Sequence, residues 1–298
     1  MEFIRSNLIR DRVSATEVVE RDLPTNPISH LILALSGCQI TDETTLAEML
    51  AFVNTIEVTR SGVTVLSMQS EDLYALNCYL YAQRPNLTNC VTTATATRTL
   101  GLIIPFGRKI FDPEECFPAT KKGDLTVRLN MTVLGTSVDT GIISLEAVEL
   151  VGAAPTHYMK STLMVVVAPG AVGDNDVELP MGNELVCIQL RRTSGPANAG
   201  HVYGISNARV LVDNKEYGYV SARAQCLDAD RGMQVGGPES TMLLQQLPTP
   251  TNTFWLDYDP NKDGKWLLDT AQASSVKVRL DMGVNEATYM TLVERVAV

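Results

Sequence analysis

Apolar and polar residues alternate in many short stretches of this chain. Alternation with a period of two predicts half-buried β-strands, because successive side chains of a strand point to opposite faces of its sheet. Helical patterns occur between only a few of these stretches, which excludes an α/β protein with a helix after nearly every strand. The fold class is therefore predicted to be all-β with short inserted helices. Strands are expected at residues 30–35, 55–59, 63–67, 100–104, 125–134, 142–151, 159–167, 185–191, 208–212, 217–222, 253–258, 276–281 and 288–296.

Two short helices and two long loops interrupt this pattern. One helix is expected to begin at residues 41–43, and a second is expected to be capped by Ser70 and to end before Arg84–Pro85. The segments 105–123 and 228–250 contain many turn-forming residues, and both are predicted to be loops.

The first 28 residues show a different spacing. Their apolar residues recur at roughly helical intervals, at Ile4, Leu8, Ile9, Val18, Val19 and Leu23. Pro24 and Pro27 would end any helix. Residues 1–28 are therefore predicted to form an N-terminal arm that is partly helical and lies outside the first β-domain.

The second half of the chain faintly repeats the first half. The segment Leu125–Met131 reappears as Val276–Met282, a shift of 151 positions (276 − 125). The hairpin pattern of Ile56–Val65 reappears as Val210–Tyr219, a shift of 154 positions (210 − 56). Two matches in the same order at nearly the same shift indicate two copies of one β-domain.

Length and composition fit two packed domains. The chain has 298 residues, of which 45% are hydrophobic and 19% are charged, as in ordinary globular proteins. Gly152–Thr156 is short and lacks bulky side chains, so it is the best candidate for a linker. The two domains are expected at residues 29–152 and 153–298.

Charge and cysteine spacing exclude several classes of protein. The net charge is −10, and the arginines near the N-terminus, Arg5, Arg10 and Arg12, are offset by Glu2 and Asp11. A nucleic-acid-binding protein normally carries a basic patch, so direct binding of nucleic acid is not expected. The six cysteines lack zinc-site spacing, and the chain shows neither an apolar signal core nor a membrane-spanning stretch. Buried thiols in a reducing cytoplasm are expected.

No catalytic, cofactor-binding or metal-binding residues are predicted. The histidines, His30, His157 and His201, lack the spacing of a metal site, and each is expected at the surface or in a capping role. Asp259–Gly264 places oxygen ligands before a glycine, as a calcium loop does, but Thr270 stands where a bidentate glutamate is needed. A plain turn is the favoured interpretation of that segment, and a weak Ca²⁺ site is the alternative.

Aromatic residues are expected to pack in the core. Tyr74, Tyr79 and Tyr81 have a spacing that would pack a helix on a sheet. Residues 254–258 alternate as one strand would if it had a buried and an exposed face.

Four segments, in this order, resemble the first domain of the double jelly-roll major capsid proteins. Those proteins come from tailless icosahedral phages with an internal membrane, relatives of the tectiviruses, the corticoviruses and the small membrane-containing phages of Flavobacterium. The second half resembles the family mainly through the duplication. The four segments are Ile56–Val65 with its turn at residues 60–62, Ser70–Leu76, Leu102–Arg108 and Leu125–Leu129.

The resemblance implies two tandem eight-stranded jelly rolls side by side, and a major capsid protein that is not an enzyme. Three chains would form a pseudo-hexagonal capsomer, because six similar rolls approximate sixfold symmetry. The partners would be the other chains of the homotrimer, neighbouring capsomers, minor capsid or penton proteins, and the internal membrane through the arm of residues 1–28. The protein would assemble in the host cytoplasm and reside in the virion capsid.

Two other functions are compatible with tandem β-sandwiches. A carbohydrate-binding spike or adhesin would expose aromatic residues in one loop cluster, with Trp255, Tyr258 and Trp266 as the candidates. The low aromatic content of 6% weakens that alternative. A glycan-processing enzyme would need a pair of carboxylates, and the sequence does not identify such a pair.

Overall fold

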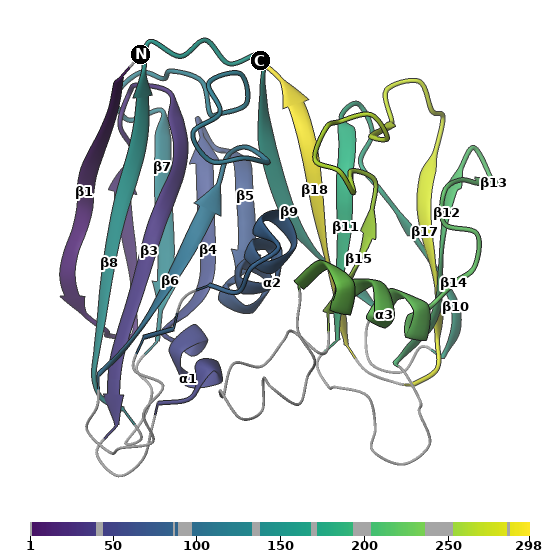
Figure 1. Cartoon of the computed structure of the whole chain (residues 1–298), viewed down its shortest axis with the longest axis horizontal. Coiled ribbons are helices and arrows are strands. Elements are labelled where there is room, and N and C mark those ends of the chain that lie inside the picture. Colours follow the sequence, from purple (N-terminus) through teal and green to yellow (C-terminus); the bar gives the residue numbers. More distant parts are fainter. Residues whose placement is uncertain are drawn as a thin grey trace. The chain divides into compact units, whose positions relative to one another are not determined.

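The chain folds into two compact units (Figure 1). The computed structural model describes residues 2–39, 44–85, 87–88, 97–132, 138–167, 172–192, 204–235, 253–284 and 287–298. The first unit extends to Thr162 and includes Ala297 and Val298, and the second unit begins at Leu163. Both units consist mainly of β-strands, as the alternating pattern predicts.

The first unit is a sandwich of two sheets, and the chain crosses repeatedly from one sheet to the other. One sheet has the order β1-β8-β3-β6, and the other has the order β2-β7-β4-β5. This is the strand order of an eight-stranded jelly roll. The start of β9 (His157–Val167) adds a short parallel pair beside β5. The strands of the roll are β1 (Glu2–Val13), β2 (Glu17–Asp22), β3 (Ile28–Gln39), β4 (Val53–Arg60), β5 (Val63–Gln69), β6 (Arg98–Pro105), β7 (Leu125–Met131) and β8 (Val138–Val151).

The second unit repeats this arrangement. One sheet has the order β9-β18-β11-β15 with β16 beside β11, and the other has the order β10-β17-β12-β13 with β14 beside β12. β9 is the first strand of this roll, and β13 and β14 both pair with β12, in the position that β5 has beside β4. The strand order is then the same as in the first roll, which confirms the predicted pair of jelly rolls. The further strands are β10 (Gly173–Glu178), β11 (Glu184–Arg192), β12 (Ile205–Val212), β13 (Lys215–Glu216), β14 (Ala222–Arg223), β15 (Thr253–Asp257), β16 (Leu268–Asp269), β17 (Val276–Met282) and β18 (Thr288–Ala297).

The strand orders of the two rolls are clear, but the boundary between the rolls along the chain is less sharp. The division by contacts falls inside β9, after Thr162. The linker expected at Gly152–Thr156 lies between β8 and β9. The domain limits at residues 152 and 153 therefore stay a prediction.

The repeated sequence segments occupy equivalent strands. One repeat lies on β7 and β17, the other begins on β4 and β12, and β4 pairs with β7 as β12 pairs with β17. Ile56 is opposite Leu129, and Val210 is opposite Val278. The observed register of β12 and β17 differs by two residues from the register that the two sequence shifts would give. A difference of two residues leaves each side chain on the same face of its sheet.

The predicted helical arm at residues 1–28 is wrong. The described part of this segment forms β1 and β2, which pair with β8 and β7 and are the first two strands of the first roll. The register of β1 shifts between Asn7 and Ile9 and again between Ile9 and Arg12. Such irregularities interrupt the period of two, so the apolar residues of a bulged strand imitate helical spacing.

Two helices lie in the first unit, close to the positions expected. α1 (Leu46–Ala51) begins with a capping box in which Thr45 and Glu48 hydrogen-bond to each other's backbone N–H. Its expected start at residues 41–43 lies outside the described residues.

α2 (Ser70–Tyr81) contacts β4, β5 and β6. Gln69, not Ser70, occupies its N-cap position. The predicted cap is wrong because the Ser70 hydroxyl donates instead to the carbonyl oxygen of Val53, on the neighbouring strand. The helix is buried on nearly all sides, from Asp72 to Leu80, and not along a single amphipathic stripe.

α3 (Ala224–Val235) occupies a segment that was expected in part to be a loop. Only a few of its side chains are buried, among them Leu227 and Val235, so its sequence carries little helical periodicity. Its contacts with β12, β14 and β15 stabilise it, since packing contributes more to short helices than intrinsic propensity does. The rest of the predicted loop, residues 236–250, lies outside the described residues.

Two predicted strands also differ from the observed ones. β3 continues past Gly37, where a Cβ atom would lie only 2.7 Å from the Phe52 ring, so glycine permits close packing there and does not end the strand. The strand expected at residues 217–222 is interrupted, because Gly218 and Ser221 adopt left-handed backbone angles (φ +68° and +61°).

Truncation of a buried side chain on β1 tests whether this strand belongs to the core. Ile9 is 4% exposed and Ile4 is 45% exposed. We expect Ile9→Ala to lower the thermal unfolding midpoint by roughly 5–10 °C, from a loss of about 3 kcal/mol, and Ile4→Ala to lower it much less. Scanning calorimetry of both variants measures the difference, and equally small shifts would contradict a core role for β1.

Candidate assembly surface

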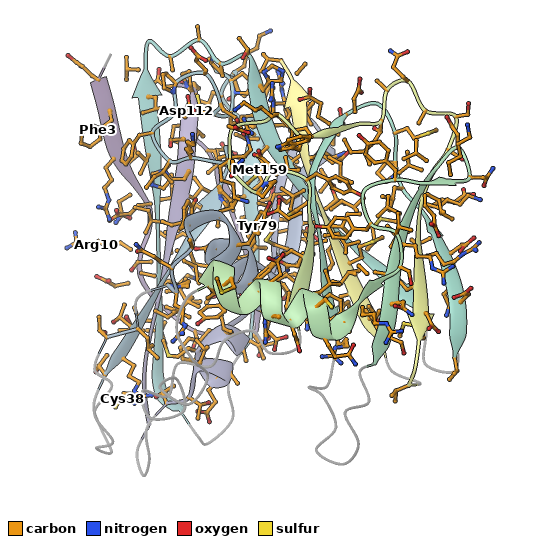
Figure 2. All side chains as sticks on the ribbon, turned by 45° about the vertical axis from the view of Figure 1, so that its right-hand side comes forward. Phe3, Arg10, Cys38, Tyr79, Asp112 and Met159 are labelled. Atoms are coloured by element: carbon orange, nitrogen blue, oxygen red, sulfur yellow. The ribbon has the colours of Figure 1, made fainter. Side chains whose placement is uncertain are left out.

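Strand β1 is an open edge of its sheet. It ends the order β1-β8-β3-β6, and among the described residues only β8 pairs with it. Phe3, Ile4 and Val13 on this strand are exposed, and Figure 2 shows Phe3 and Arg10 along the same edge. A long edge strand with apolar side chains is a template for association with another chain. We therefore take β1 as the candidate assembly surface.

An aromatic cluster extends this surface onto the loop between β6 and β7. The rings of Phe3 and Phe111 meet edge to face with centroids 5.7 Å apart, and Phe111 meets His30 in the same way at 5.3 Å. Ile110 and Phe111 are exposed although they are large and apolar. We call Phe3, Ile110 and Phe111 the Phe3 patch. It was not predicted, because the residues are far apart in sequence and only the pairing of β1 with the sandwich brings them together.

The loop that carries the Phe3 patch is held rigidly at its base. The Arg108 guanidinium lies 2.7 Å from the Glu115 carboxylate, both side chains are nearly buried, and the Arg108 backbone N–H also donates to Glu115. At Gly107 a Cβ atom would lie 2.0 Å from the Glu115 carbonyl oxygen. The segment at residues 105–123 is a loop between β6 and β7, as predicted, and these contacts pack it at its base.

His30 lies beneath this patch, in contrast to the surface or capping role predicted for it. It is buried, and its Nδ1 atom lies 3.0 Å from the Ser29 hydroxyl. Burial, and secondarily the positive charge of Arg5, lowers the pKa of His30 from 6.5 to about 4. His157 begins β9 and hydrogen-bonds to Thr156, and His201 lies outside the described residues.

The arginines near the N-terminus do not form a basic patch. Arg5 pairs with Glu146 on the neighbouring strand, and Arg12 pairs with Glu17. The hydrogen bond from Arg12 lowers the pKa of Glu17. Each of these positive charges is thus matched by a carboxylate, although the partners differ from those nearest in sequence.

The calcium-like segment forms a tight turn stabilised by its own backbone. The Asp259 carboxylate accepts a hydrogen bond from the Gly264 N–H at 2.8 Å, and the Asp257 carboxylate accepts one from the Asp259 N–H at 2.7 Å. The Lys262 ammonium lies 3.9 Å from the Asp257 carboxylate. These contacts favour the plain turn over a cation site.

The aromatic candidates for carbohydrate binding are mostly buried. Trp255 packs inside the second unit and donates from its indole N–H to Gln189 at 3.1 Å, and Tyr258 is also buried. The prediction of an exposed face on this strand is wrong, since β15 is covered on both sides. Only Trp266 of the three is exposed, so they do not form a platform for a sugar ring. Tyr74 and Tyr79 are buried, as expected for core packing.

Few features of the described residues suggest a catalytic or metal-binding site. They contain no group of three or more His, Cys, Asp or Glu residues placed to hold a metal ion. Burial raises the pKa of Cys78 to about 12 and of Cys116 to about 11, so both remain thiols at neutral pH. A hollow of about 300 Å³ between α1 and α2 is lined by one carboxylate, that of Glu71, whereas a glycosidase needs two. No helix in the described part of the chain is long and apolar enough to cross a membrane.

Solved structures of major capsid proteins share this fold along its whole length. The major capsid protein of bacteriophage PM2 has a TM-score of 0.66 at 11% identity, and the match covers 99% of this chain and 97% of that chain. The major capsid protein of Sulfolobus turreted icosahedral virus has a TM-score of 0.73 at 13% identity, with 100% and 97% covered. A chain of the PBCV-1 virus capsid has a TM-score of 0.62 at 10% identity, with 99% and 93% covered.

No protein-family model and no curated protein matches the chain. The similarity is therefore one of fold: this chain has the double jelly-roll architecture seen in those major capsid proteins.

A substitution in the loop base tests its rigidity. We expect Gly107→Ala to destabilise the protein by about 2–3 kcal/mol, because the added methyl group would overlap the Glu115 carbonyl oxygen, a backbone atom with little room to move. Gly101→Ala on β6 is the matched control, since nothing lies within 4 Å of a Cβ atom there. Urea unfolding of both variants measures the effect, and an equal response would show that the loop adapts.

The buried His30 predicts a loss of stability in mild acid. Its pKa is about 4 in the folded protein and 6.5 in the unfolded chain, so the unfolded state takes up the proton first as the pH falls. The stabilisation is complete above pH 6.5 and declines towards pH 4, by about 2 kcal/mol at pH 5. His30→Leu should remove this part of the pH dependence, and His157→Gln should retain it. Urea unfolding at pH 7 and pH 5 distinguishes the variants, and identical pH dependence in both would refute the assignment.

Proposed function

We propose that this chain is the major capsid protein of an icosahedral virus, and that three copies assemble into a pseudo-hexagonal capsomer. One observation carries the proposal: two sandwiches with the same strand order follow each other in a single chain. Three such chains offer six similar rolls, and a closed cyclic trimer leaves no unsatisfied interface of its own type.

The extent of the structural matches supports this proposal. The match to the PM2 major capsid protein covers 97% of that chain, so nearly every part of that capsid protein has a counterpart here. The open edge at β1 and the Phe3 patch add exposed apolar surface of the kind that association would cover.

In this proposal the protein resides in the virion capsid after assembly in the host cytoplasm. Its partners are the other chains of the trimer, neighbouring capsomers, and minor capsid or penton proteins. The net charge of −10 supports a shell that does not bind the genome directly, as when an internal membrane separates the two. Contact with that membrane through a helical arm is no longer part of the proposal, because residues 2–22 include β1 and β2 of the first roll.

A structural role without enzymatic activity fits the same observations. The matched proteins are structural components of capsids. The carbohydrate-binding alternative loses its support with the burial of Trp255 and Tyr258.

The oligomeric state tests the proposal. We expect a particle of about 98 kDa in solution (3 × 32.5 kDa), measured by size-exclusion chromatography with light scattering. Negative-stain images of assembled protein should show hexagonal capsomers. A monomer at every concentration, with no hexagonal particles, would refute the proposed function.

A further inference from the structure

We propose that the outer face of the sheet β1-β8-β3-β6 packs against the same face of a second copy, across a two-fold axis between neighbouring capsomers. The inference rests on the proposed function, because it requires capsomers that meet side by side in a shell. All four strands belong to the first unit (Figure 1). We call this surface the outer sheet face, and it is centred on Ile32, Ala34, Gly101, Ile103, Ile142 and Ser144.

The strands of this sheet alternate between buried and partly exposed residues. On β3, Leu33 and Leu35 are fully buried, and Ala34 between them is partly exposed. Ala34 lies opposite Gly101 on β6 and Ser144 on β8, so these three positions share one side of the sheet. A Cβ atom at Gly101 would meet no atom of the described residues within 4 Å. The centre of the outer sheet face is therefore open in the described part of the chain.

The composition of this face differs from that of the other outer face of the same roll. On the sheet with β4 and β7, Glu57 and Arg128 point outwards and pair with each other, as on an ordinary solvated sheet. On the outer sheet face, Ile32 stands opposite Ile103, and both are partly exposed. Isoleucines on the outward side of an antiparallel sheet indicate a surface that another chain covers.

The polar groups of the outer sheet face already have partners within the chain. The hydroxyl oxygens of Ser36 and Thr99 lie 2.8 Å apart, and the Ser144 hydroxyl donates to the Asp11 carboxylate at 3.2 Å. Burial of a polar group costs much less free energy when its hydrogen bond is kept. This face can therefore be covered without leaving these hydroxyl groups unpaired.

The charges on this face favour a second copy as the partner. Arg5 pairs with Glu146 on the face, and Arg10 lies 3.7 Å from Asp11 on β1, so the two pairs carry no net charge. The whole chain has a net charge of −10, so copies repel each other where their acidic surfaces meet. A face of matched charges lets identical copies approach, and it attracts neither a basic nor an acidic partner.

The area of the face fits a contact between capsomers better than a separate dimer. β3 and β6 pair over residues 30–37. Four strands of this length, about 4.8 Å apart and with about 3.4 Å per residue, cover on the order of 500 Å² in each copy. Two such faces bury on the order of 1,000 Å², less than the roughly 1,600 Å² of a standard stable interface. A shell repeats the contact between trimers that are already joined elsewhere, so a weak contact suffices there.

Charges introduced at the centre of the face test whether it meets its own copy. A two-fold axis through this face brings Ala34 of one copy near Ala34 of the other. We expect Ala34→Glu and Ala34→Lys each to raise the protein concentration needed for assembly of trimers into larger particles at least about 10-fold, because like charges would meet. A mixture of separately purified Ala34→Glu and Ala34→Lys trimers should assemble at a lower concentration than either variant alone. Light scattering measures these concentrations.

The matched control lies on the other outer face. Thr126 on β7 is partly exposed like Ala34, so Thr126→Glu should leave the assembly concentration nearly unchanged. Size-exclusion chromatography with light scattering first establishes that each variant forms trimers. Ala34→Glu trimers that assemble as readily as Thr126→Glu trimers, or a mixture that assembles no better than its components, would overturn the contact and leave the capsid proposal standing. A protein that never trimerises would overturn both.

Thiol labelling tests the same contact without an added charge, and it decides the question if Ala34→Glu does not form trimers. We expect Ala34→Cys to react with a maleimide at least about 10-fold more slowly in assembled particles than in free trimers, and Thr126→Cys to keep its rate. Peptide mass spectrometry separates these sites from the partly exposed Cys38 and the exposed Cys226. An equal rate for Ala34→Cys in particles and in trimers would show that the outer sheet face stays open, against the proposal.

Discussion

The need to cover the edges of β-sheets shapes this protein. An edge strand presents backbone N–H and C=O groups that must find a partner or remain in water. In the first roll, α2 contacts both β6 and β5, so one helix covers an edge of each sheet, and β9 adds a strand beside β5. In the second roll, α3 contacts β15 and β14 in the same way. The helices α2 and α3 therefore cover edges of the sheets, and β1 and β2 are the strands left at the opposite edge of the first roll.

The rigid loop next to β1 reduces the free-energy cost of association with another chain. Ordering a loop when two proteins bind costs free energy, and a loop that is already ordered avoids this cost. The ion pair between Arg108 and Glu115 fixes the segment that carries Ile110 and Phe111 before any partner arrives. A buried pair of this kind contributes little net stability, but removal of one partner leaves the other charge uncompensated, which favours one conformation of the loop.

The sequence predicted the central strands well and the edges poorly. β4, β7, β12 and β17 alternate regularly and carry the recognisable repeat, because one face of such a strand packs in the core and the other is partly exposed. β1 escaped detection because its register shifts hide the alternation, and α3 because its stability comes from contacts with strands and not from its own periodicity. The buried state of His30 and Trp255 also depends on contacts between distant segments, which no local pattern contains. The assembly surface was missed for the same reason, since it lies on the segment interpreted as an arm.

The two chain termini lie at one end of the first unit, and this has a practical consequence. Glu2 lies opposite Val151. The N–H of Val298 donates to the carbonyl oxygen of Thr156, which follows Val151 by only a few positions in the chain. A peptide fused to either terminus would therefore emerge on the same side of the roll (Figure 1). In an assembled shell, both fusions would be displayed together or enclosed together, so the protein offers two attachment points for cargo on a single side of the particle wall.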